Sequence, residues 1–202
     1  AGRGGAAARF VAHNFVAYNP ATRMETLFVG DRVRVRTGID GAGPEVEFEL
    51  ARWGREGALG EAAPVEERAI DGQGLSMRRG AVSEWYVNEE RGLEQGFDIH
   101  ERPGGAGELV VEVDVAGELI PRLADETTVI LQSKAGEVAF RYSGLAAWDA
   151  EGTGLAAHME LDDRTIRLVV DDSQAVYPVT VDPWVESAPI VASDAAYFDS
   201  FG

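Results

Sequence analysis

Two carboxylates that flank an aromatic pair near the middle of the chain are the residues best suited to chemistry. Glu84 and Glu94 lie on either side of Trp85 and Tyr86. Two carboxylates beside an aromatic platform are the outline of a glycosidase. In a strand, however, Glu84 and Tyr86 point to one face and Trp85 to the other. A core position for Trp85 with Glu84 on the solvent side explains this pattern without catalysis, and we favour that interpretation.

The remaining reactive side chains are scattered along the sequence. The three histidines, His13, His100 and His158, lack the short spacing of a metal site, and no Gly-x-Ser-x-Gly motif accompanies them. Cysteine is absent, which excludes disulfides, thiolate nucleophiles and cysteine-bound metals. We therefore expect a chain with no catalytic activity and no cofactor of its own.

Acidic turns leave calcium open as an alternative. Asp98, the pair at 162–163 and the pair at 171–172 offer the oxygen ligands that Ca²⁺ prefers, but no Asp-x-Asp-x-Asp-Gly loop occurs. The net charge of −17 makes acidic turns common in any case. The same charge repels phosphate backbones, which argues against nucleic-acid partners. No run of about 20 apolar residues is present, so we expect no membrane insertion.

The four tryptophans leave carbohydrate binding open as an alternative function. Trp53, Trp85, Trp148 and Trp184 each lie in or beside a strand pattern. We expect them to pack inside the protein, with Trp85 and Trp148 in the core together with Phe97. If they were exposed instead, they would form a platform on which sugar rings stack.

The dominant hydrophobic period is two residues, which is typical of half-buried strands. Apolar and charged residues alternate at 33–36, 45–50 and 111–115, and similar short runs follow up to residue 181. Glycine, aspartate, asparagine and proline separate these runs, as expected for hairpin turns. The sequence therefore predicts an all-β fold with very little helix: an antiparallel β-sandwich of jelly-roll or immunoglobulin-like type.

The chain of 202 residues suits one large domain or two small ones. We expect one sandwich module at residues 1–185, with a possible division into two subdomains near 54–64. A surface loop at 54–64 is the favoured interpretation, because neither half alone suffices for a good sandwich. Since proline cannot donate to a sheet ladder, we expect the last strand to end at Pro183 and residues 186–202 to form a linker.

Several motifs together resemble a known type of bacterial module. The specific part is Glu-Trp-Tyr-Val-Asn at 84–88 with Gly-Leu-Glu-Gln-Gly-Phe at 92–97, supported by motifs at 142–145, 147–149 and 177–183 and by the final Phe-Gly. From about residue 19 to its end, the chain resembles the β-rich N-terminal module that precedes FG-GAP repeats, the blades of integrin-α-like β-propellers, in large secreted bacterial proteins. This resemblance implies a non-enzymatic module, extracellular or on the cell surface, with 186–202 as a linker and the start of a truncated FG-GAP repeat. The calcium loops of such repeats would lie beyond Gly202.

The leading functional hypothesis is a structural or adhesive module of a larger surface protein. The alternatives are a carbohydrate-binding sandwich and a subunit of an extracellular polymer assembled by strand addition, with a secreted hydrolase last. The expected partners are other protein chains or the propeller, and glycans in the alternative. Apolar side chains near the end are expected to dock on such a partner, because exposed aromatics reduce solubility: Ile190, Val191, Tyr197, Phe198 and Phe201.

Overall fold

A computed structural model describes residues 7–11, 14–38, 42–72 and 74–188 of the chain. Strands account for 65% of the described residues, and these ranges contain no helix. The predicted all-β antiparallel sandwich with very little helix is therefore confirmed. In these ranges no helix is long and apolar enough to cross a membrane.

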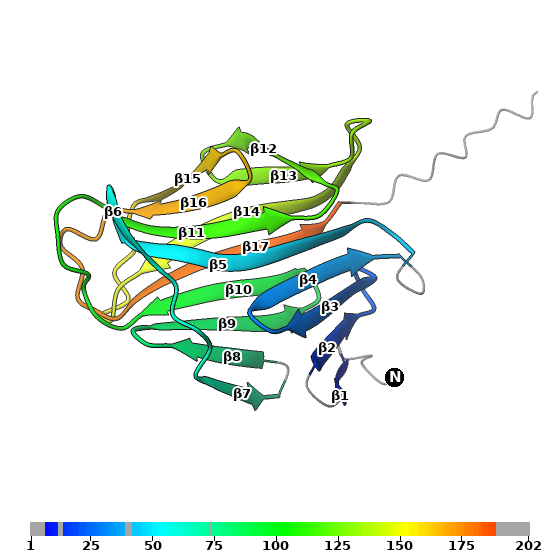
Figure 1. Ribbon diagram of the computed structural model, residues 1–202, viewed down its shortest axis with the longest axis horizontal. Helices are drawn as coiled ribbons and strands as arrows, with labels where there is room; N and C mark the ends of the chain where they lie inside the picture. Colours follow the sequence, from blue (N-terminus) through cyan, green and yellow to red (C-terminus); the bar gives the residue numbers. More distant parts are fainter. Residues whose placement is uncertain (1–6, 12–13, 39–41, 73, 189–202) are drawn as a thin grey trace, which may run out of the picture.

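Two antiparallel sheets form the layers of the sandwich (Figure 1). Sheet A has the strand order β1-β2-β3-β4-β5-β11-β16-β15, with β6 paired to β5. Its strands are β1 (Ala7–Val11), β2 (Asn14–Asn19), β3 (Met24–Val29), β4 (Arg32–Thr37), β5 (Glu45–Arg55), β6 (Ala58–Glu61), β11 (Leu109–Ala116), β15 (Ala157–Asp162) and β16 (Thr165–Val170).

Sheet B has the strand order β12-β13-β14-β17-β10-β9-β8-β7. Its strands are β7 (Glu67–Asp71), β8 (Gly74–Arg79), β9 (Val82–Glu89), β10 (Gly92–Ile99), β12 (Ile120–Asp125), β13 (Thr128–Gln132), β14 (Val138–Trp148) and β17 (Val179–Ser187). The chain thus builds sheet A up to β6, sheet B from β7 to β10, and then alternates between them, so that β17 lies in the middle of sheet B.

The core lies between the inner faces of the two sheets. Alternate residues of β5 and β11, such as Phe48 and Val113, are buried against alternate residues of β10 and β14, such as Phe97 and Phe140. Burial of each such side chain contributes about 1.5–3 kcal/mol, which is why the period of two predicts this fold. The prediction that Phe97 lies in the core is correct, since its exposed fraction is 0%.

Polar contacts join the two sheets along one side. The side-chain amide of Asn88 on β9 donates to the carbonyl of Tyr18 on β2 at 3.1 Å, and the amide of Asn19 donates to the carbonyl of Glu89. At the other side the amide of Met159 on β15 donates to the carbonyl of Glu126, beside β12, at 2.6 Å. Figure 1 shows these sides as opposite margins of the sandwich.

The expectation that the last strand ends at Pro183 is wrong, because β17 continues to Ser187 between β14 and β10. Pro183 has no N–H for the ladder, and β14 accommodates it with an irregularity between Ser143 and Ala146. Gly144, within that bulge, has a φ of 69°, a conformation that suits glycine. Residues 54–64 comprise the β5–β6 hairpin and the connection toward sheet B.

Candidate functional site

The strand β9 places its residues on the opposite faces from those expected. Glu84 is fully buried, with an exposed fraction of 0%, whereas Trp85 lies on the outer face of sheet B and is only partly buried. The expectation of Trp85 in the core and Glu84 in solvent is therefore wrong. Tyr86, on the same face as Glu84, forms a T-shaped ring contact with Phe28 of sheet A, at 5.0 Å between ring centroids.

Glu84 belongs to a polar network inside the sandwich. Arg79 donates to its carboxylate at 3.0 Å, and the hydroxyl of Tyr86 and the amide of Gln95 also donate to it. Tyr142 extends the network by donating to Oε1 of the Gln95 side chain at 2.8 Å. Burial raises the pKa of Glu84, and Arg79 opposes that rise. These mutual contacts account for Glu84 and give it a structural role, with no access for a substrate.

Three of the four tryptophans share the outer face of sheet B, which we call the tryptophan face. Trp85 on β9, Trp184 on β17 and Trp148 on β14 are each partly exposed. The expectation that Trp148 lies in the core is therefore also wrong. The fourth, Trp53 on β5, packs partly buried against the core instead.

Trp85 lies across the neighbouring strand because that strand carries a glycine opposite it. Gly96 on β10 pairs with Trp85, and a Cβ atom at position 96 would lie 2.0 Å from Cε2 and Cζ2 of the indole. The indole thus occupies the space that a side chain at 96 would need. On the far side of Gly96, the next strand carries Asp182, whose other neighbour is Ala146.

The ion pair of Arg91 and Glu186 packs against Trp184. The guanidinium of Arg91 lies over the indole at 4.8 Å from the ring centroid and donates to Glu186 at 2.6 Å. Ser143 donates to the same carboxylate at 2.7 Å. Strand spacing and rise per residue place the Cα atoms of Trp85 and Trp184 about 12 Å apart, so the face is longer than one sugar ring.

A carboxyl pair lies between these two tryptophans. The carboxyl groups of Glu94 on β10 and Asp182 on β17 lie close enough to shift each other's pKa. Burial, together with the charge of Glu94, raises the pKa of Asp182 to about 7. Burial and the nearby Glu89 raise the pKa of Glu94. Of two carboxyls in such contact, at least one binds its proton more tightly than an isolated carboxyl does.

One end of the tryptophan face carries hydroxyl and imidazole groups. Ser83 Oγ lies 2.7 Å from His100 Nε2, and Thr180 donates to Asp98 at 2.7 Å. A serine–histidine contact is the first requirement of a nucleophile. Among the described residues no carboxylate contacts the His100 ring, so the group that would orient the base is missing. Sequence spacing gave no sign of this contact, because it depends on pairing of β9 with β10.

The candidate calcium ligands do not form a cluster in the described part of the chain. Asp172 accepts from Arg55 at 2.5 and 2.9 Å, from Tyr177 at 2.5 Å and from Arg102 at 3.2 Å, so its charge is already balanced. Asp171 accepts from the amide of Ser173 in a turn. In the described part of the chain, no three acidic or histidine side chains are grouped as a metal site would require.

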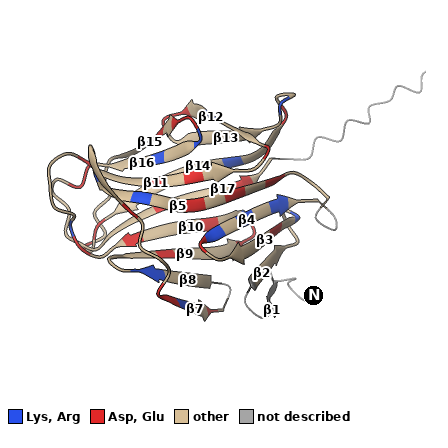
Figure 2. Ribbon diagram, in the orientation of Figure 1, with Lys and Arg blue, Asp and Glu red and all other residues tan. Residues whose placement is uncertain are grey.

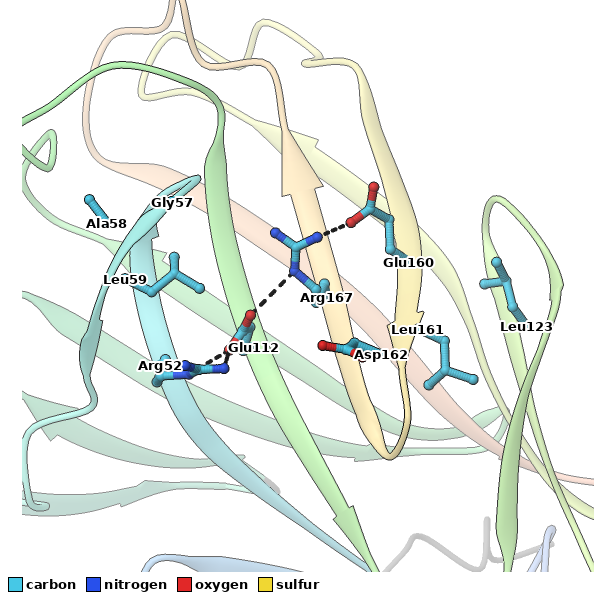
Figure 3. Close-up of a pocket in the computed structure, with 10 residues that line it drawn as sticks. All are labelled: Arg52, Gly57, Ala58, Leu59, Glu112, Leu123, Glu160, Leu161, Asp162 and Arg167. Carbon is cyan, nitrogen blue, oxygen red and sulfur yellow. Dashed lines mark hydrogen bonds and ion pairs between the residues drawn. The ribbon is translucent and has the colours of Figure 1, made fainter.

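The outer face of sheet A carries charged residues that neutralise one another. Figure 2 shows basic residues on β4 beside acidic residues on β5, and Arg34 contacts Glu47 at 2.5 Å. A depression of about 720 Å³ on this face is drawn in Figure 3. Its buried Glu112 lies between Arg52 at 2.7 Å and Arg167 at 3.2 Å. Because these groups satisfy each other, we place the candidate site on the tryptophan face.

The apolar residues expected to dock on a partner, from Ile190 to Phe201, lie outside the described residues, so their docking stays a prediction. No protein-family model matches the chain, and no curated protein matches it significantly. The resemblance to modules that precede FG-GAP repeats therefore also stays a prediction.

Proposed function

We propose that this chain is a non-enzymatic, adhesive module of a larger extracellular protein and that it binds carbohydrate on the tryptophan face. The observation that carries the proposal is that Trp85, Trp148 and Trp184 lie together on one outer face and not in the core between the sheets. Partly exposed indoles offer flat apolar surfaces for the faces of sugar rings.

Polar groups on the same face complement the stacking surfaces. Sugar hydroxyls both donate and accept, and the face offers carboxylates, hydroxyls and an imidazole: Glu94, Asp98, Asp182, Glu186, Ser83, Ser143, Thr180 and His100. A few placed polar groups around apolar surface are the usual composition of a small-ligand site. The described residues offer surfaces for stacking and groups for hydrogen bonding but no oriented nucleophile, which supports binding without turnover.

A panel of immobilised glycans tests this function, followed by titration calorimetry with the ligands that bind. We expect Trp85→Ala to lower affinity at least tenfold, and the matched variant Trp53→Ala, on the other sheet, to leave it unchanged. Near-UV circular dichroism confirms that each variant is folded. Loss of binding in both variants alike, or no glycan bound at all, would contradict the proposal.

The extracellular location is tested on cells that produce the protein. Brief protease treatment of intact cells should release peptides of this chain into the medium, where mass spectrometry identifies them. Release only after the cells are broken would contradict this part of the proposal.

A further inference from the structure

Asp182 is nearly buried, yet one of its oxygens has no partner. Its exposed fraction is 8%, and Oδ1 is one of three buried side-chain polar atoms without a hydrogen bond in the described ranges. Ala146 pairs with it on β14, and the register of β10 with β17 sets Gly96 opposite it on the other side; neither carries a polar side chain that could donate to it. A buried acceptor without a donor is costly, so it points to a donor that binds there.

The surroundings of Asp182 favour a cation as that donor. Glu94 contacts it directly and is partly exposed, so a ligand can approach the pair from that side. The charged groups that face the pair come from the neighbouring strands and one turn, and acids outnumber bases: Glu89, Glu94, Asp98 and Glu186 against Arg91 and Arg141. The net charge of −17 adds a field that attracts cations and repels acidic glycans.

Trp184 already illustrates how a cation binds on this face. Arg91 lies over its indole at 4.8 Å and forms an ion pair with Glu186. Trp85 and the Glu94–Asp182 pair offer the same combination of aromatic surface and carboxylate. Arg91 lowers the pKa of both carboxyls through its charge, but its own ion pair is with Glu186. An ammonium group beside an indole gains both charge pairing and cation–π attraction.

Resting on the glycan binding proposed above, we infer that the bound glycan carries free amino groups and that the Glu94–Asp182 pair receives one of them as an ammonium. The ligand class is therefore an oligosaccharide of de-N-acetylated hexosamine. Its ammonium replaces the proton bound to the carboxyl pair, so that binding releases this proton to the solvent. A sugar ring beside the amine stacks on Trp85, whereas the indole of Trp184 already carries Arg91.

Calorimetry with two oligomers of one backbone tests the inference: a glucosamine oligosaccharide and its fully N-acetylated counterpart. At pH 7 and moderate salt we expect the glucosamine oligomer to bind the wild-type chain at least tenfold more tightly. Asp182→Asn and Glu94→Gln should each remove that preference. Titration in buffers of different ionisation enthalpy measures the protons released, and the difference between the wild-type chain and Asp182→Asn isolates those of the pair.

Each other outcome overturns the inference. Equal or tighter binding of the acetylated oligomer, still lost in Trp85→Ala, would leave glycan binding intact and remove the ammonium site. A preference that both carboxyl variants retain and that high salt abolishes would be diffuse attraction to an acidic chain. Binding of neither oligomer would exclude this ligand class, while the wider glycan panel decides the proposed function separately.

Discussion

The buried pair of Arg79 and Glu84 predicts a large and specific loss of stability when it is broken. Their side chains are 2% and 1% exposed, and the contact is 3.0 Å. Replacing Glu84 with Leu leaves a buried guanidinium whose remaining carboxylate, Asp31, lies at 3.5 Å and is 42% exposed. Removing one partner of a buried pair costs about 3–5 kcal/mol, a large part of the 5–15 kcal/mol that stabilises a typical domain.

The double variant Arg79→Leu/Glu84→Leu, compared with the two single variants, measures the interaction energy between Arg79 and Glu84. We expect its loss to be smaller than the sum of the two single losses by at least about 2 kcal/mol, because no charge is left unpaired. Urea unfolding followed by tryptophan fluorescence measures the free energies. As a control, Arg32→Ala at an exposed pair with Glu49 should cost at most about 1 kcal/mol. Single losses below about 1 kcal/mol, or strictly additive losses, would refute the buried network.

Three further changes have defined outcomes. Gly96→Ala puts a Cβ atom 2.0 Å from the Trp85 indole, so the ring must move; we expect a loss of about 1–3 kcal/mol and an altered near-UV spectrum, and an unchanged spectrum would contradict this. Asp182 has a pKa of about 7 when folded, so the folded chain binds a proton that the unfolded chain releases above about pH 4; the free energy of unfolding should therefore fall as pH rises from about 4 to 7, by at most about 4 kcal/mol relative to Asp182→Asn. Equal pH profiles of the two chains would contradict this. Asp172→Ala strands the buried Arg55, and urea unfolding should show a loss of about 3–5 kcal/mol; a loss under 1 kcal/mol would mean that the contact is dispensable.

The sequence predicted the strands well because alternation of apolar and polar residues is a local property. The strand at β9 was expected, but its two faces are nearly equally apolar: Val82 and Tyr86 on one, Trp85 and Val87 on the other. Which face of β9 points into the core depends on Arg79 and Gln95. Arg79 neutralises Glu84 inside the sandwich, and both side chains donate hydrogen bonds to it. Those partners become neighbours only once β8, β9 and β10 pair, which one sequence does not reveal.

A weaker signal for the tryptophan face was present in the sequence. Gly96 lies inside a strand between Gln95 and Phe97, and a glycine within a strand often marks close approach of another group. Phe97 and Leu93 share a face with Gln95, which sets Gly96 and Glu94 on the other face. The contact of Glu94 with Asp182 could not be predicted, because β17 joins β10 from more than 80 residues away and runs through Pro183.

Resonances of the four indole N–H groups give the most direct test of carbohydrate binding on the tryptophan face. The chain contains four tryptophans, Trp53, Trp85, Trp148 and Trp184, so a ¹⁵N-labelled sample gives four indole N–H signals. Single Trp→Phe variants assign each signal. On titration with a glycan selected from the panel, we predict that the signals of Trp85 and Trp184 shift and saturate together while that of Trp53 stays in place. Shifts confined to Trp53, or none in Trp85 and Trp184 at saturation, would contradict the proposed site.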